Sequence, residues 1–179
     1  MQIDLWSHPA AYSITPLDIR AGCELLSATV LRFRFLVRGS IDELVVPPPS
    51  LPIRANNLWR TTCFEAFLAP AEGSSYVELN FSPSSQWAAY DFSAYRQGMV
   101  QAALPAPPEI EVERNADGLE MIATISLNVA AESCRLRLCA VIEEQNGYLS
   151  YWADSHPGDK PDFHRQDCFT LELPAAGPA

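Results

Sequence analysis

The sequence has few basic residues, few histidines and no long apolar run, and each shortage excludes a class of function. Twelve lysines and arginines stand against 22 acidic residues, giving a net charge of −10 over 179 residues. Nucleic acids and anionic membranes attract basic patches, so we expect neither as a partner. No segment reaches the roughly 20 apolar residues of a transmembrane helix. Met1 is not followed by the basic and apolar regions of a signal peptide.

Disulfide and metal-binding patterns are also missing. The cysteines are odd in number and no pair has CxxC spacing. The three histidines form no cluster with them at the spacing of metal ligands. We therefore expect free, mostly buried thiols in a cytoplasmic protein, with no metal and no cofactor. The oligomeric state stays open.

Short strand-like runs separated by turn residues fill most of the chain. Asp117-Gly118 and Asn146-Gly147 are hairpin signals, and proline clusters interrupt the runs. Turns about every 8–12 residues predict an all-β fold, a two-sheet antiparallel β-sandwich with very little helix. A chain of this length is expected to form one domain, residues 1–179. The expected strands are 26–37, 41–46, 63–68, 76–81, 86–92, 109–113, 119–126, 136–143, 148–152 and 168–173.

Two consecutive expected strands, 63–68 and 76–81, each carry polar side chains on one face. A strand sends alternate side chains to opposite faces. Tyr76, Glu78 and Asn80 therefore share a face, opposite Val77 and its apolar neighbours, and Glu65 lies opposite the apolar face of its own strand. Carboxylates and amides hydrogen-bond hydroxyls, and aromatic rings stack on sugar rings. This face predicts binding of a carbohydrate or another small polar ligand. The alternative is a solvated face with ion pairs to nearby arginines.

Tryptophans and a polar loop supply further candidates. Trp59 follows a polar loop and Trp152 precedes one, so both are candidate stacking platforms, although aromatic residues also dominate cores. The segment 156–165 is rich in functional groups, and loops on a rigid scaffold often carry binding residues. The candidate ligand-binding residues are Trp59, Arg60, Glu65, Glu78, Asn80, Tyr95, Arg96, Trp152, His156, Lys160 and His164.

Four segments carry a family resemblance. LWRTTCFEAFL, YVELNFSP, WAAYDFSAYRQGM and YWADSHPGDKPDFHRQDCFTLEL together resemble DOMON-like domains related to family 9 carbohydrate-binding modules, in a bacterial branch. The resemblance implies a β-sandwich of jelly-roll or immunoglobulin-like type. It also implies non-catalytic binding of sugars or haem.

The sugar-binding members of that family carry the pattern W-x-x-D-x-V-E-x-F. Trp59 matches its tryptophan and Glu65 its glutamate, while Thr62 or Cys63 stands where an aspartate is expected. Those members clamp a terminal sugar between two tryptophans, the second from late in the chain. The resemblance therefore implies Trp152 as the second wall, and the missing aspartate puts the sugar ligand itself in question.

Three functions remain to be distinguished. The first is a non-catalytic module for a carbohydrate or other small polar ligand. The second is a haem-binding domain, in which Met99 and His156 or His164 would ligate iron. The third is a glycan-active enzyme using Glu65 and Glu78, but the chain has no nucleophile elbow, phosphate loop or metal motif. We therefore expect a binding module and no enzyme.

Overall fold

Antiparallel strands dominate the computed structural model, which describes residues 1–128 and 131–175. The helical segments among these residues are short 3₁₀ turns at Pro9–Ala11, Ile41–Glu43, Leu58–Arg60 and Gln166–Cys168. The strands are β1 (Gln2–Ser7), β2 (Leu17–Ser27), β3 (Val30–Gly39), β4 (Cys63–Pro70), β5 (Tyr76–Phe81), β6 (Trp87–Phe92), β7 (Val100–Gln101), β8 (Glu109–Asn115), β9 (Gly118–Ser126), β10 (Cys134–Glu143), β11 (Leu149–Ala153) and β12 (Leu171–Leu173).

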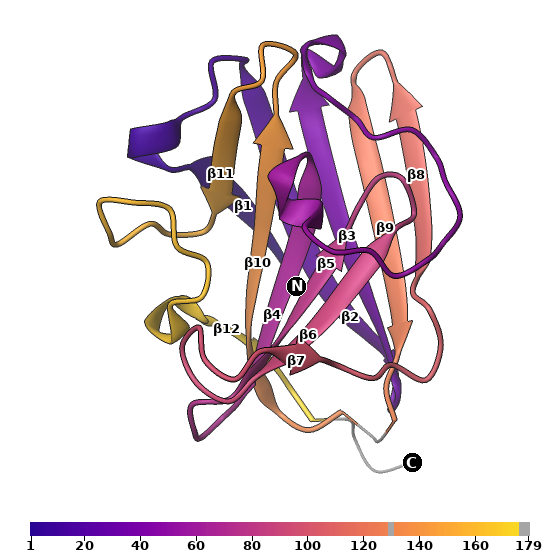
Figure 1. The fold of residues 1–179 in the computed structure, drawn as a ribbon, viewed down its shortest axis with the longest axis vertical. Coiled ribbons are helices and arrows are strands. Elements are labelled where there is room, and N and C mark those ends of the chain that lie inside the picture. Colours follow the sequence, from indigo (N-terminus) through magenta and orange to yellow (C-terminus); the bar gives the residue numbers. More distant parts are fainter. Residues whose placement is uncertain (129–130, 176–179) are drawn as a thin grey trace.

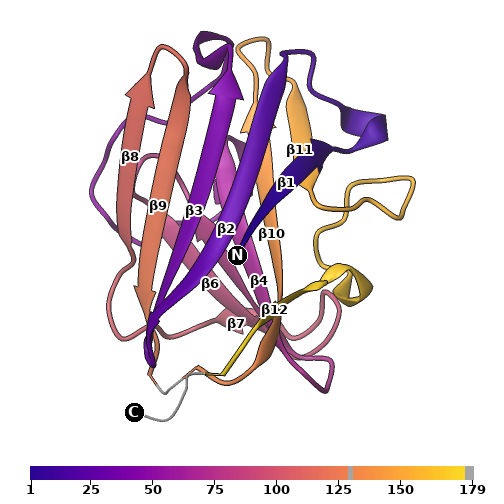
Figure 2. The ribbon, with the colours of Figure 1, turned by 180° about the vertical axis from the view of Figure 1, so that it is seen from behind.

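Hydrogen bonding joins these strands into one continuous sheet. Its order is β7-β6-β5-β4-β10-β11-β1-β2-β3-β9-β8, and β12 pairs with β10 beyond the end of β11. Strand β1 pairs with β2 through its first residues and with β11 through Trp6 and Ser7, so the sheet turns a corner there. Figures 1 and 2 show β4, β5 and β6 crossing one face of β2, β3 and β9. The predicted all-β antiparallel fold is confirmed as one curled sheet, and a jelly-roll or immunoglobulin-like connectivity stays a prediction.

The main core lies between the two facing halves of this sheet. The rings of Phe33 and Phe81 lie 5.6 Å apart, and those of Phe35 and Phe64 lie 4.9 Å apart. Each contact joins β3 of one half to β4 or β5 of the other. The alternation predicted for β3 is confirmed, because Leu31, Phe33, Phe35 and Val37 are all fully buried.

A second apolar cluster covers the opposite face of β4, β5, β6, β10 and β11, which we call the pocket face. The segment between β11 and β12, residues 154–170, passes over this face and is called the late loop (Figure 1). It contributes Phe163 and Phe169 to the cluster. The cluster comprises Leu58, Cys63, Phe67, Ala69, Tyr76, Ala88, Tyr90, Phe92, Cys139, Val141, Ala153, Phe163 and Phe169. These strands are therefore buried on both faces.

Some predicted strands differ from the structure. The strand expected at 41–46 is wrong, since Ile41–Glu43 forms a 3₁₀ turn and Leu44 makes one isolated bridge to Glu144. Within 168–173 only Leu171–Leu173 is extended. Strands β1 and β2, the corner of the sheet, were not predicted, although Leu17, Ile19, Ala21, Cys23 and Leu25 of β2 alternate with polar residues or glycine along the sequence.

The cysteines are free thiols, and four are buried: Cys23, Cys63, Cys139 and Cys168. This agrees with the prediction from their spacing. Within residues 1–128 and 131–175, no helix is long and apolar enough to cross a membrane.

Candidate functional site

A pocket of about 900 Å³ opens on the pocket face. Strands β4, β5, β6, β10 and β11 form its base, and the late loop and the segments 56–59 and 96–101 form its walls. Its lining combines polar groups with aromatic rings. The lining residues are Asn56, Asn57, Trp59, Glu65, Glu78, Tyr90, Phe92, Arg96, Met99, Val100, Gln101, Val141, Tyr151, Pro161, Phe163 and His164.

Two glutamates reach the base of this pocket from neighbouring strands. Strand register places Glu65 of β4 opposite Asn80 of β5, and Glu78 opposite Phe67 and Tyr90. The alternation in β5 is confirmed, because Leu79 lies in the main core while Glu78 lines the pocket. Glu65 is 4% exposed and Glu78 is 6% exposed. The alternative of a solvated, ion-paired face is therefore wrong for both.

Protein groups hold Glu78 in place. The Asn80 side chain donates a hydrogen bond of 2.6 Å to the Glu78 carboxylate, and its Oδ1 lies 3.7 Å from the Cys63 thiol. Burial raises the pKa of Glu78, although the Asn80 hydrogen bond and the Arg96 charge oppose the rise. Asn80, a predicted ligand residue, is fully buried behind Glu78 and does not line the pocket. It acts here as a support for that carboxylate.

Glu65 is held differently. Among the described residues, none donates a hydrogen bond to its carboxylate. Burial raises its pKa well above the ordinary value, the neighbouring Glu78 raises it further, and the more distant charges of Arg96 and Arg137 offset only part of this rise. A buried carboxylate without donors is costly to ionise. The pocket therefore contains an acidic group with unused hydrogen-bonding capacity.

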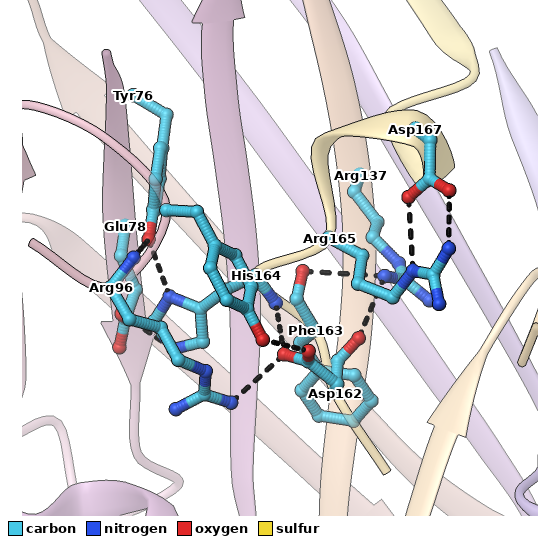
Figure 3. A network of polar contacts seen from close by, with 10 residues as sticks. Tyr76, Glu78, Arg96, Arg137, Asp162, Phe163, His164, Arg165 and Asp167 are labelled. Atoms are coloured by element: carbon cyan, nitrogen blue, oxygen red, sulfur yellow. Dashed lines mark hydrogen bonds and ion pairs between the residues drawn. The ribbon is translucent and has the colours of Figure 1, made fainter. Parts of the chain in front are cut away.

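His164 of the late loop lies over this base and is fixed by Tyr76 (Figure 3). The Tyr76 hydroxyl accepts a hydrogen bond from the Arg96 backbone N–H at 3.1 Å and makes a second hydrogen bond, of 2.7 Å, with His164 Nδ1. The remaining ring nitrogen, Nε2, lies 3.7 Å from Glu78. Burial lowers the pKa of His164 to about 4, and the Arg96 charge acts in the same direction. His164 is therefore neutral at pH 7.

Tyr95, Arg96 and Asp162 form a polar clamp at the edge of the pocket. The Tyr95 hydroxyl donates to Asp162 at 2.6 Å, and the Arg96 guanidinium donates to the same carboxylate at 2.9 Å. Burial tends to raise the pKa of Asp162, but these two hydrogen bonds and the Arg96 charge outweigh it, so the pKa is lowered. The clamp ties the turn after β6 to the late loop. Arg96 lines the pocket, while the Tyr95 side chain lies outside it.

Arg137 anchors the late loop from beneath (Figure 3). This side chain is fully buried on β10, and it donates to the backbone carbonyls of Ser155 at 2.6 Å, Asp162 at 3.1 Å and Phe163 at 3.3 Å. Its Nε lies 3.8 Å from the Asp154 carboxylate, an ion pair without a hydrogen bond. The loop that carries Phe163 and His164 is thereby held over the strands.

Trp59 stands at the rim of the pocket. It belongs to the short 3₁₀ turn Leu58–Arg60, which Asn57 starts in a left-handed conformation with φ of 60°. Trp59 is 44% exposed, and the Arg60 guanidinium lies 5.2 Å from its ring centre. Arg60 itself does not line the pocket. A half-exposed indole at a pocket rim can stack on a ligand ring.

Trp152 does not form a second wall, and the expectation that it does is corrected here. It is 5% exposed, lies in the main core, and donates through Nε1 to Ser150 at 2.9 Å. Its neighbour Tyr151 lines the pocket instead, next to Val141, its partner in the ladder. A shift of one residue along a strand exchanges the two faces, which explains the misplacement.

Two other loop candidates also lie outside the pocket. His156 packs edge-on against His8 and makes a 2.7 Å hydrogen bond with the Trp6 carbonyl. Lys160 is exposed to solvent. Of the predicted ligand residues, the structure brings together Trp59, Glu65, Glu78, Arg96 and His164.

Several lining residues were missed by the sequence reasoning. Tyr90 and Phe92 share the pocket face because β6 pairs with β5 through Glu78–Tyr90 and Tyr76–Phe92. A hairpin register between these two strands would have revealed them.

Arg137 could have been found as the charged residue within the apolar run of β10, where burial demands partners.

Thr62 and Cys63, which stand at the aspartate position of the family pattern, make their contacts within the protein. Thr62 is buried, and its hydroxyl accepts a hydrogen bond from the Glu143 backbone N–H at 3.1 Å. Cys63 Sγ faces Asn80 instead. No carboxylate reaches the pocket from this position.

In the part of the chain that the structure describes, no group of three His, Cys, Asp or Glu side chains could hold a metal ion. Both ring nitrogens of His164 face protein groups, and His156 Nε2 faces a carbonyl. Met99 and His164 both line the pocket, and haem binding through them stays a prediction.

Solved structures share this fold at low sequence identity, although the sequence matches no protein-family model and no curated protein. A candidate carbohydrate-binding protein from Bacteroides uniformis superposes with a TM-score of 0.65 at 10% identity, covering 95% of this chain and 84% of that one. A family 9 carbohydrate-binding module from Caldicellulosiruptor kristjanssonii, solved with glucose, superposes with a TM-score of 0.56 at 12% identity, covering 93% and 81%. This chain therefore has the fold of the family 9 carbohydrate-binding modules.

Proposed function

We propose that this chain is a non-catalytic binding module that takes a carbohydrate into the pocket above Glu65 and Glu78. The observation that carries the proposal is the Glu65 carboxylate, which is buried at the pocket base and receives no hydrogen bond from any described residue. Sugar hydroxyls would supply the missing donors.

The rest of the pocket fits the same ligand class. Trp59 at the rim and Tyr90, Phe92, Tyr151 and Phe163 on the walls offer ring faces and edges to the apolar side of a sugar. A volume of about 900 Å³ accommodates one or two sugar rings. The module of the same fold from Caldicellulosiruptor kristjanssonii is described in complex with glucose, which makes glucose the first ligand to test.

A glycan-active enzyme is the second candidate, and one observation favours it. Glu65 and Glu78 face the same pocket, and the pKa of each is raised by burial, as expected for a general acid. However, Asn80 and His164 engage Glu78 from two sides, which suits a fixed binding group better than one that exchanges protons with substrate.

Calorimetric titration with glucose and cellobiose tests the binding proposal. We expect measurable binding, and Trp59→Ala should weaken it about tenfold through lost stacking. The matched control is Trp6→Ala, since Trp6 is 65% exposed and lies outside the pocket. Equal losses in both variants, or no binding to any glycan, would contradict the proposal. Release of a shortened product from cellobiose would instead establish the enzyme.

A further inference from the structure

The cationic side chains around the pocket have partners within the protein, whereas the two glutamates at its base do not have a cation each. Arg96 is the cationic side chain in the lining, and its guanidinium is already paired with Asp162 at 2.9 Å. Arg137 lies beneath the base, where three carbonyls take its hydrogen bonds. His164 is neutral at pH 7. Glu65 and Glu78 therefore face the pocket volume as acidic groups without a bound cation of their own.

The two glutamates differ in what they still need. Glu78 has the Asn80 amide as a donor and the His164 ring close by. Glu65 has no donor among the described residues, and the neighbouring Glu78 makes its ionisation more costly. A hydroxyl supplies one donor and no charge. An ammonium group supplies three donors and a positive charge that both carboxylates attract.

The aromatic lining also favours a cation. Tyr90 lies beside Glu78 in the strand ladder, and its hydroxyl is directed to Asn56 at 2.9 Å, which leaves its ring to face the pocket. Tyr151, Phe92 and Phe163 line the same volume. Ring faces attract ammonium groups, and more strongly where water is excluded.

We propose that the sugar bound in this pocket carries an amino group, whose ammonium pairs with Glu65 and, across the ladder, with Glu78. This inference rests on the proposed function and narrows it to amino sugars. It also predicts an order of binding affinity among related sugars. A neutral sugar of the same shape binds less tightly, and a sugar acid binds least because its carboxylate meets two others.

Titration of the full chain with glucosamine, glucose and glucuronate, at about pH 6.5, measures this order directly. This pH lies below the usual pKa of an amine, so glucosamine is a cation. Glucosamine differs from glucose at one substituent, which isolates the charge. We expect glucosamine to bind about tenfold more tightly than glucose, as a charge-assisted hydrogen bond predicts, and glucuronate to bind more weakly than either.

Glu65→Gln tests where the ammonium lies. This variant keeps the shape of the side chain but cannot ionise to pair with an ammonium group, so the ratio of the glucose Kd to the glucosamine Kd should fall from about ten towards one. Glu111→Gln is the matched control, because Glu111 is exposed on β8, outside the pocket, and its loss changes the net charge equally. It should leave the ratio unchanged.

The outcomes separate the inference from the function beneath it. Equal affinity for glucose and glucosamine, both weakened by Trp59→Ala, overturns the amino-sugar inference and leaves the carbohydrate module standing. A ratio that survives in Glu65→Gln also overturns the inference, since the charge then acts elsewhere. No binding of any of the three sugars overturns both.

Discussion

The two halves of the curled sheet bury their strands differently. In β3 the buried residues alternate with exposed ones such as Arg32 and Arg34, so one face packs on the core and the other meets solvent. In β10 every residue from Leu136 to Ile142 is buried. An antiparallel sheet normally alternates, so continuous burial shows that something covers its second face. Here the late loop and its apolar cluster do so.

Covering the second face has a chemical consequence. Polar side chains on the open half are solvated, but those on the covered half must find partners or remain costly. Arg137, Glu78 and Asn80 have partners within the protein. Glu65 has none among the described residues and faces the pocket. The comparison therefore singles out Glu65 as the residue whose missing partner the proposed ligand would supply.

The largest expected effect comes from breaking the contact between the halves. Phe81 of β5 is fully buried and its ring lies 5.6 Å from that of Phe33. Phe81→Ala should lower the free energy of unfolding by about 3–5 kcal/mol, through lost burial and a new cavity. Urea denaturation measures this loss. Trp59→Ala, at the exposed rim, should change the same quantity by no more than about 0.5 kcal/mol. A comparable loss in Trp59→Ala would mark it as a core residue.

The next largest effect is expected from loosening the late loop, which covers the pocket face. Arg137→Ala removes three hydrogen bonds to the late loop and leaves Asp154 without its ion pair. We expect a loss of about 3 kcal/mol in the free energy of unfolding. Sugar affinity should fall as well, because Phe163 and His164 lose their anchor.

Arg135→Ala is the control for that variant. Arg135 lies two residues away on β10, reaches the Gln166 carbonyl at 3.2 Å, and is only partly buried. It should cost less than about 1 kcal/mol and leave sugar affinity intact. Similar losses in both variants would mean that the three hydrogen bonds of Arg137 hold the late loop no more firmly than the one from Arg135 to Gln166.

Sequence patterns predicted the inward faces of the strands better than the contacts made on the covered face. Alternation located the buried residues of β3 and separated Glu78 from Leu79, because one face of each strand is uniformly apolar. It misplaced Trp152, since β11 carries an aromatic residue in each phase, Tyr151 towards the pocket and Trp152 in the main core. The anchor of the late loop, Arg137, contacts the Asp162 carbonyl, which lies 25 positions away along the chain. No local pattern encodes that distance.

A smaller effect tests the hydrogen-bonded link between the loop and the strands. The Tyr76 hydroxyl accepts a hydrogen bond from the Arg96 N–H and makes another with His164 Nδ1. Tyr76→Phe keeps the ring, which stacks on Phe92 at 4.7 Å, and should cost about 1–2 kcal/mol in the free energy of unfolding. Tyr95→Phe removes a single bond at an exposed site and should cost about 0.5 kcal/mol or less. If the two variants lose equal amounts of unfolding free energy, the hydrogen bonds of Tyr76 stabilise the protein no more than the exposed hydrogen bond of Tyr95.

The smallest effect is a change in the pH dependence of stability. Burial raises the pKa of Glu65, so the folded protein holds a proton that the unfolded chain releases near pH 4.3. This contribution to stability is complete below about pH 4.3 and is lost as the pH rises through the raised pKa. Glu78 acts in the same direction. His164 acts in the opposite one, because its pKa is lowered to about 4, and its contribution is lost as the pH falls from about 6.5 towards 4.

Glu65→Gln should remove the contribution of Glu65 to the pH dependence of stability and leave the opposite contribution of His164. Relative to the unmodified protein, the Tm of the variant should rise steadily between about pH 4.5 and pH 8, because glutamine never ionises. Glu111→Gln, which removes an exposed charge on the open half, should show a Tm difference that stays nearly constant over the same range. A constant difference for Glu65→Gln as well would mean that its carboxylate is solvated like the glutamates of β8. The distinction between the covered and the open half would then fail at the residue on which the binding site depends.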